Sequence, residues 1–197
     1  MLYELRTYKA APGRLGTLHA RFRDHTRGLF QRHGIDDVVY WTYLAGGHND
    51  ELVYLVRFAD AASRTAAWKS FMADPDWQQA YKESHERAGG PINQWVDNRF
   101  LSPTDFHPTD HGGPSDSPRI FEWRSYIAAP GKMPLLLDRF RKHTTRMFAQ
   151  HGLTSIGYWL NDVGGSSDEL IYVLAFDDLA QRDSAWAAFG ADEEWRA

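Results

Sequence analysis

The chain of 197 residues carries a formal net charge of −4, which argues against a nucleic-acid-binding protein, because such proteins normally present a basic face. It contains no cysteine, which excludes disulfides, thiolate metal sites and a thiol nucleophile. No apolar run approaches the roughly 20 residues that span a bilayer and no signal peptide is visible, so we expect a cytoplasmic protein without a membrane span.

The first predicted elements are a strand and a long helix. Residues 3–8 alternate in character, which predicts a strand. One face carries Tyr3, Leu5 and Thr7, and the other carries Glu4, Arg6 and Tyr8. After a Pro-Gly turn, a helix is expected over residues 14–32. Its apolar residues recur every three or four positions and His25 falls in this stripe, so we predict that its imidazole faces inward.

A β-hairpin, two helices and a strand complete the first half. Residues 38–44 and 51–58 are rich in Val, Tyr and Trp and flank a Gly-containing loop, which predicts the hairpin. Asp60 can cap a second helix, and Asp74-Pro75 is typical of the start of a third, short helix. A Gly-Gly-Pro sequence ends that helix, and residues 92–101 are predicted to form a fourth strand.

The second half of the chain repeats the first. Residues 3–79 recur at 121–197, an offset of about 118 residues, with about 34 of 77 aligned positions identical and no gap. The order β-α-β-β-α-α-β predicts an α+β fold with two tandem ferredoxin-like domains. A sheet with aromatic residues on both faces has to cover its bare face. We therefore expect the domains to pack sheet-to-sheet as an intrachain dimeric α+β barrel, a pseudo-dimer, with further homo-oligomerisation left open.

The expected domains are residues 1–101 and 119–197, joined by a linker at residues 102–118 that is rich in Pro and Gly. The repeat has no counterpart of residues 80–101 in the second domain, which therefore lacks its last helix and strand. We expect that a tail of this domain is missing. The alternative is a three-stranded sheet whose vacant edge invites pairing with another chain.

Several of these motifs together resemble the NIPSNAP family. They are the Tyr-Glu-Leu-Arg-Thr-Tyr opening, the His-Gly pair closing the first helix, the Tyr40-Trp41 strand, and the run of Trp68, Phe71 and Asp74-Pro75-Asp76-Trp77. The resemblance implies the dimeric α+β barrel superfamily, which includes small monooxygenases, haem-degrading enzymes, chlorite dismutases and lactone isomerases. It implies little about the reaction, because bacterial-type members have no firmly assigned activity and a fold alone does not determine function.

His25 and its counterpart His143 are the predicted catalytic residues. A buried imidazole near neutral pH can donate, accept or ligate. As catalytic residues, His25 and His143 would act as a general acid or base in a pocket. The alternatives are a core histidine bonded to a neighbouring group, or a metal or haem ligand.

The predicted substrate-binding residues are Arg6, Tyr8 and Trp41, with their counterparts Arg124, Tyr126 and Trp159. Charged groups on an interior strand face are costly unless they bond to each other or face a cavity. Arg6 would bind a carboxylate or enolate, Tyr8 would hydrogen-bond it, and Trp41 would form an aromatic wall. The alternatives are an ion pair between the two sheets and ordinary aromatic core residues.

The remaining motifs do not predict further sites. His33 and His151 lie beside the glycines that end the first helices, where capping explains them. His107 and His111 are four residues apart but lie in the linker without helical register, so no metal site is predicted. Walker, nucleophile-elbow and dinucleotide motifs are not found, and the cofactor stays unknown.

Three functions are compatible with this sequence. The first is binding of a small apolar or anionic molecule, extending to a cofactor-independent monooxygenase or isomerase with His25 as base. The second is a non-catalytic structural or interaction module. The third is a haem-binding protein with His25 or His143 as proximal ligand. A cavity touching His25 and Arg6 would support the first function, and tight packing around them would support the second.

Overall fold

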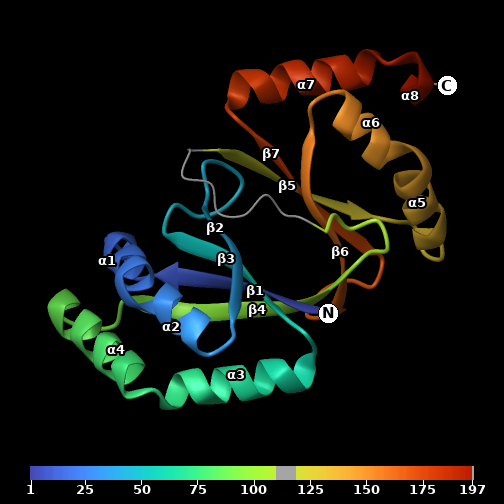
Figure 1. The fold of residues 1–197 in the computed structure, drawn as a ribbon. Helices are drawn as coiled ribbons and strands as arrows, with labels where there is room; N and C mark the ends of the chain where they lie inside the picture. Colours follow the sequence, from blue (N-terminus) through green and yellow to red (C-terminus); the bar gives the residue numbers. More distant parts are fainter. Residues whose placement is uncertain (110–118, 197) are drawn as a thin grey trace. The chain divides into compact units, whose positions relative to one another are not determined.

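The computed structural model describes residues 1–109 and 119–196, which form two compact units, residues 1–101 and 102–197. Both units combine an antiparallel sheet with helices (Figure 1), so the predicted α+β fold with two repeated halves is confirmed. Residues 110–118 of the predicted linker lie outside the described residues. The sheet-to-sheet packing of the two halves stays a prediction.

Unit 1 contains a four-stranded antiparallel sheet in the order β2-β3-β1-β4. The strands are β1 (Leu2–Ala10), β2 (Asp36–Thr42), β3 (Glu51–Phe58) and β4 (Asn93–Pro103). The helices are α1 (Leu15–Arg21), the π-helical η1 (Phe22–Thr26), α2 (Arg27–Arg32), α3 (Ala61–Ala73) and α4 (Pro75–Ala88). Asp60 and Asp74 begin α3 and α4 by accepting backbone N–H groups at 2.8 Å each, because these groups have no partner inside the helix.

Unit 2 repeats this arrangement with three strands in the order β6-β7-β5. The strands are β5 (Ile120–Ile127), β6 (Thr154–Val163) and β7 (Glu169–Phe176). The helices are α5 (Met133–Arg139), the π-helical η2 (Phe140–Thr144), α6 (Thr145–Gln150), α7 (Leu179–Ala191) and α8 (Glu193–Arg196). Over residues 119–196, β5 pairs with β7 alone, whereas its counterpart β1 pairs with both β3 and β4.

Part of the predicted linker packs against unit 2. The backbone N–H of Thr104 donates to the Tyr158 carbonyl at 3.0 Å, and His107 Nδ1 accepts the Tyr158 N–H at 3.0 Å. The Phe106 ring lies 5.3 Å from the Tyr158 ring, measured between centroids. These contacts place the segment before residue 110 on the core of unit 2.

A tyrosine at the centre of each sheet organises the aromatic core. In unit 1, the ring centroid of Tyr54 lies 5.5 Å from Tyr8, 5.1 Å from Phe22 and 5.4 Å from Tyr40. Tyr172 occupies the same position in unit 2. Edge-to-face and offset ring pairs of this kind stabilise a core beyond the area they bury.

A π-helical turn in the first helix of each unit decides which residues face the core. The Arg27 N–H donates to the Phe22 carbonyl five residues back, and Thr26 Oγ1 donates to the Arg21 carbonyl at 3.2 Å. The wider turn rotates the following side chains relative to an α-helix. Thr26 is therefore buried and His25 is exposed. In unit 2, Thr144 is likewise buried and His143 is exposed.

The prediction that His25 and His143 face inward is therefore wrong. It rested on α-helical spacing, which does not account for the extra residue in the π-helical turn. Their proposed acid, base or ligand roles lose the buried environment on which they depended.

We expect Thr26→Ala to lower the free energy of unfolding by about 1–2 kcal/mol, because a buried side chain and its hydrogen bond are lost together. His25→Ala should change it by less than about 0.5 kcal/mol, since that side chain is exposed. Urea unfolding followed by tryptophan fluorescence measures both variants. A larger loss for His25→Ala would contradict the faces assigned here.

Candidate functional site

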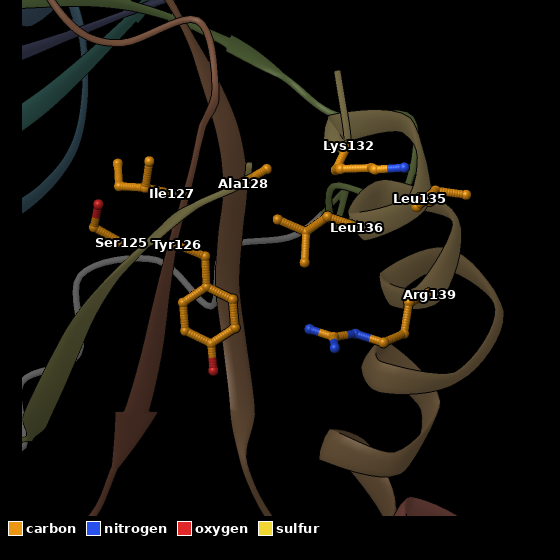
Figure 2. A pocket seen from close by; sticks show the side chains of 8 residues that line it. All are labelled: Ser125, Tyr126, Ile127, Ala128, Lys132, Leu135, Leu136 and Arg139. Carbon is orange, nitrogen blue, oxygen red and sulfur yellow. The ribbon is translucent and has the colours of Figure 1, made fainter. Parts of the chain in front are cut away.

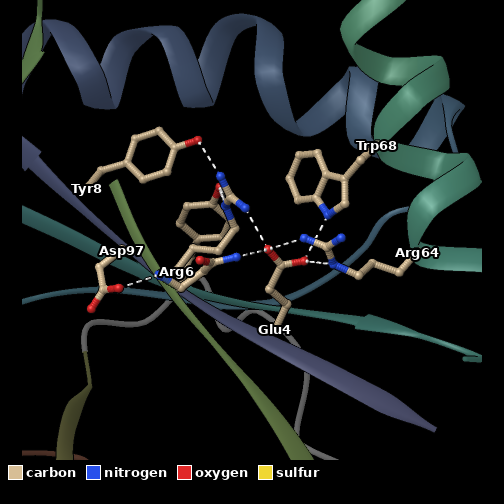
Figure 3. Close-up of polar contacts among 8 residues, drawn as sticks. Glu4, Arg6, Tyr8, Arg64, Trp68 and Asp97 are labelled. Carbon is tan, nitrogen blue, oxygen red and sulfur yellow. Dashed lines mark hydrogen bonds and ion pairs between the residues drawn. The ribbon is translucent and has the colours of Figure 1, made fainter. Parts of the chain in front are cut away.

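A fully buried carboxylate, Glu4, organises a polar cluster between β1 and α3 (Figure 3). Glu4 Oε2 accepts bonds from Arg64 Nε at 2.7 Å and Trp68 Nε1 at 2.8 Å. Glu4 Oε1 accepts bonds from Arg6 Nη1 at 2.6 Å, Arg64 Nη2 at 3.0 Å and Asn98 Nδ2 at 3.1 Å. Burial alone would raise the pKa of Glu4. These donors and the charge of Arg6 outweigh burial and hold the pKa below its usual value.

Arg6 is fully engaged inside this cluster. Its Nε donates to the Tyr54 hydroxyl at 2.8 Å and its Nη2 donates to the Tyr8 hydroxyl at 3.2 Å, in addition to the Glu4 contact. The guanidinium carbon lies 4.5 Å from the centroid of the Trp68 ring, which is a cation–π arrangement. Arg6 and Tyr8 thus lie together on the helix-covered face. The ion pairing joins the sheet to α3, so the alternative of an ion pair between two sheets is wrong here.

Unit 2 contains the same cluster in a more open form. Glu122 accepts bonds from Arg124 Nη1 at 2.6 Å, Arg182 Nε at 2.6 Å and Trp186 Nε1 at 2.9 Å. Arg124 Nη2 donates to the Tyr126 hydroxyl at 3.3 Å. The Glu122 and Arg124 side chains are 14% and 31% exposed, against 0% and 15% for the Glu and Arg of unit 1.

Trp41 and Trp159 do not join these clusters. Tyr40 pairs in register with Tyr54, so the next residue, Trp41, points to the opposite face of the sheet from Arg6. The same register places Trp159 opposite the face that carries Tyr158 and Tyr172. The prediction that each Trp lines one site with its Arg-Tyr pair is therefore wrong.

His25 also lies outside the cluster. It borders a shallow hollow between the first helix and α4, together with Asp24, Glu83 and Arg87. Over residues 1–109 and 119–196, no group of three or more His, Asp or Glu side chains is placed to hold a metal ion.

A wide, solvent-open cavity of about 630 Å³ lies in unit 2 between β5 and α5 (Figure 2). Leu136 and Arg139 on α5 point toward Tyr126 on β5. The lining residues are Ser125, Tyr126, Ile127, Ala128, Lys132, Leu135, Leu136 and Arg139. The cavity therefore combines apolar walls with two cationic groups and a phenol hydroxyl.

Of these lining residues, Tyr126 alone was predicted from the sequence. The others occupy ordinary helix and strand positions. Leu18 and Arg21, the unit 1 counterparts of Leu136 and Arg139, are buried.

The histidines at the helix ends bond to the residues that cap the following helix. His33 Nε2 lies 2.6 Å from Asp74 Oδ2, and His151 Nε2 lies 2.7 Å from Asp192 Oδ2. The hydrogen bond from His33 is the largest of several contributions that lower the pKa of Asp74 to about 2. In this way the end of the first helix is tied to the start of α4.

The sequence model of the NIPSNAP family matches residues 3–108 and 121–197. The chain belongs to the NIPSNAP family. It carries two tandem NIPSNAP regions, as the repeat indicated.

The chain matches only part of the length of its curated NIPSNAP relatives. The chain is 33% identical over 85 residues to Protein NipSnap homolog 3A of Pongo abelii, a match that covers 43% of this chain and 34% of that protein. It is 28% identical over 98 residues to Protein NipSnap homolog 3B of Mus musculus, covering 50% of this chain and 39% of that protein. The matched region thus spans less than half of these relatives.

The solved structures include one whose fold is similar over nearly the whole length of the NIPSNAP chain. A "putative monooxygenase" from Lactobacillus acidophilus covers 99% of this chain and 83% of its own, with a TM-score of 0.61 and 10% identity. At that identity the likeness shows the fold alone. A NIPSNAP domain protein from Burkholderia xenovorans is 25% identical and covers 55% of this chain and 99% of its own, with a TM-score of 0.48. Over the residues that the structure describes, no helix combines the length and apolar character needed to cross a bilayer.

We expect Glu4→Gln to lower the free energy of unfolding by about 3–5 kcal/mol, because Arg6 and Arg64 would keep buried charge without a counter-ion. The matched variant Glu122→Gln should cost less, since its cluster is more exposed and contains fewer donors. Chemical denaturation of both variants measures the difference. Equal losses would contradict the central role given to Glu4.

The lowered pKa of Asp74 predicts a loss of stability in acid. The folded state favours its carboxylate, so this contribution is complete above the ordinary pKa of about 4 and disappears as the pH falls toward about 2. Asp74→Asn should therefore lower the melting temperature at pH 7, and its difference from the parent should narrow between about pH 4 and pH 2. A difference that stays constant over this range would contradict the assignment.

Proposed function

We propose that this NIPSNAP chain is a ligand-binding module whose binding site is the cavity of unit 2. The observation that supports the proposal is the cavity itself, about 630 Å³ in volume, with Leu135, Leu136 and Ile127 beside the cationic Lys132 and Arg139. Apolar walls with a few converging polar groups are typical of binding sites. The ligand class that fits is an apolar body carrying an anionic or carbonyl group.

The polar cluster of unit 1 acts structurally in this proposal. Arg6 donates from Nε and both terminal nitrogens to protein groups, so an incoming anion would have to displace buried partners. Turning Arg6 toward an anion would remove one charged donor from the fully buried Glu4 carboxylate, which is unfavourable. Substrate binding by Arg6 and Tyr8 is therefore not favoured.

Catalysis, as a cofactor-independent monooxygenase or isomerase, is the second candidate. It is favoured by the fold shared with the Lactobacillus acidophilus protein, over 99% of this chain. A shared fold does not by itself establish that two proteins catalyse the same reaction. In this candidate, Arg139 and the Tyr126 hydroxyl would bind the oxyanion of the substrate in the same cavity. The exposed positions of His25 and His143 do not favour haem ligation.

Decanoate, an apolar chain with one carboxylate, tests the proposal by isothermal titration calorimetry. We expect one saturable site, and a Kd raised at least about tenfold by Arg139→Glu, because the cationic group becomes anionic. The matched control is Arg23→Glu, a reversal of an exposed charge in unit 1, which should leave the Kd unchanged. Absence of binding, or equal effects of the two reversals, would reject the cavity as the site.

A further inference from the structure

Unit 1 contains a serine, a histidine and an aspartate that are joined by hydrogen bonds. His33 Nδ1 lies 2.8 Å from Ser70 Oγ, and His33 Nε2 lies 2.6 Å from Asp74 Oδ2. The three residues come from three elements: His33 follows the last residue of α2, Ser70 belongs to the last turn of α3, and Asp74 caps the start of α4. A nucleophile, a base and a group that orients the base, all within hydrogen-bond reach, are the components of nucleophilic catalysis.

The aspartate determines which nitrogen of His33 carries a proton. Asp74 is ionised at neutral pH, because the hydrogen bond from His33 and several smaller contributions lower its pKa to about 2. An ionised carboxylate can only accept hydrogen bonds, so His33 Nε2 donates to it. In the neutral imidazole, Nδ1 therefore keeps its lone pair, and the Ser70 hydroxyl donates to Nδ1. In this arrangement His33 can take the proton of the serine hydroxyl.

The histidine and the aspartate are held in place by further contacts. Asp74 Oδ1 accepts the Asp76 N–H at 2.8 Å, and Asp74 Oδ2 also accepts a bond from Arg32 Nη1 at 3.1 Å. The His33 ring packs edge-on against Phe71, with 6.2 Å between the ring centroids. A base that is oriented in this way before a substrate arrives loses little freedom in the reaction.

Ser70 is the accessible member of the three. It is exposed, whereas the side chains of His33 and Asp74 are only 12% and 7% exposed. Ser70 lies within α3, where backbone N–H groups bond inside the helix, so the backbone of this helix offers no donors to an oxyanion. The substrate class that fits is therefore an ester with a weakly basic leaving group, such as an aryl ester or a thioester, and not an amide.

Unit 2 repeats the histidine and the aspartate without the serine. His151 Nε2 lies 2.7 Å from Asp192 Oδ2, and the His151 ring lies 6.2 Å from Phe189 at an interplanar angle of 82°, the same geometry as in unit 1. Residue 188, the counterpart of Ser70, is alanine. The tie between the two helices therefore forms without a serine, and the hydroxyl beside His33 is an addition that this tie does not require.

We propose that Ser70 is a nucleophile that accepts acyl groups from activated esters, with His33 as its general base and Asp74 as the positioning residue. Ser70 Oγ attacks the ester carbonyl carbon while its proton moves to His33 Nδ1. The bond to the leaving oxygen or sulfur then breaks, and His33 returns the proton to that atom, which gives an acyl-serine and a phenol or thiol. Water attacks the acyl carbon in turn and gives a proton to His33, which passes it to the departing Ser70 Oγ as the carboxylic acid is released. This activity is separate from ligand binding in the cavity of unit 2.

Labelling of the full chain with diisopropyl fluorophosphate tests the nucleophile, because attack forms an Oγ–P bond and releases fluoride. Peptide mass spectrometry locates the adduct. We expect Ser70 to react at least about tenfold faster than Ser184, an exposed helical serine of unit 2 whose hydroxyl donates to the Ala180 carbonyl. Ser70→Ala should also slow the release of nitrophenolate from 4-nitrophenyl acetate at least about tenfold. Equal labelling of the two serines, or an unchanged release rate, would overturn the proposal.

The repeat provides a reciprocal experiment that does not disturb unit 1. Ala188→Ser places a hydroxyl beside the His151–Asp192 pair, and labelling at position 188 should then proceed at a rate within about tenfold of that at Ser70. A position 188 that reacts no faster than Ser184 would show that this geometry does not activate a serine.

Two variants of unit 1 test the roles of the base and its support. His33→Gln should slow labelling of Ser70 at least about tenfold, and persistence of fast labelling would overturn the role of His33. Nitrogen NMR should place the proton of neutral His33 on Nε2 in the parent, and Asp74→Asn should shift it toward Nδ1 and slow labelling in the same samples. A parent with the proton on Nδ1 would contradict the proposal.

Discussion

A buried carboxylate holds the helical layer of unit 1 to its sheet. Glu4 on β1 has no solvent contact, and a charged carboxylate in such a place is stable only when its lone pairs are filled by donors. Those donors come from β1, β4 and α3, with Arg64 and Trp68 some 60 residues away in sequence. The cluster therefore fixes where α3 lies over the sheet, and the role of Arg6 in it is structural.

Local signals explain how much of the fold could be predicted from the sequence. The alternation of residues 3–8, the capping Asp60 and the Asp74-Pro75 pair each specify an element start through short-range physics. The repeat strengthened each assignment, because two copies carried the same signals. The π-helical turns were missed, since their signature is a backbone hydrogen-bond pattern and the spacing around His25 is equally compatible with a regular helix.

The candidate site was harder to predict because it depends on what covers a surface. The grouping of Glu4, Arg6 and Tyr8 on one strand face followed from strand periodicity, yet their distant partners on α3 did not. Leu136 and Arg139 carry no local signal that separates them from their buried counterparts Leu18 and Arg21. The two pairs differ in their tertiary surroundings: Leu18 and Arg21 are buried in unit 1, whereas Leu136 and Arg139 line the cavity of unit 2.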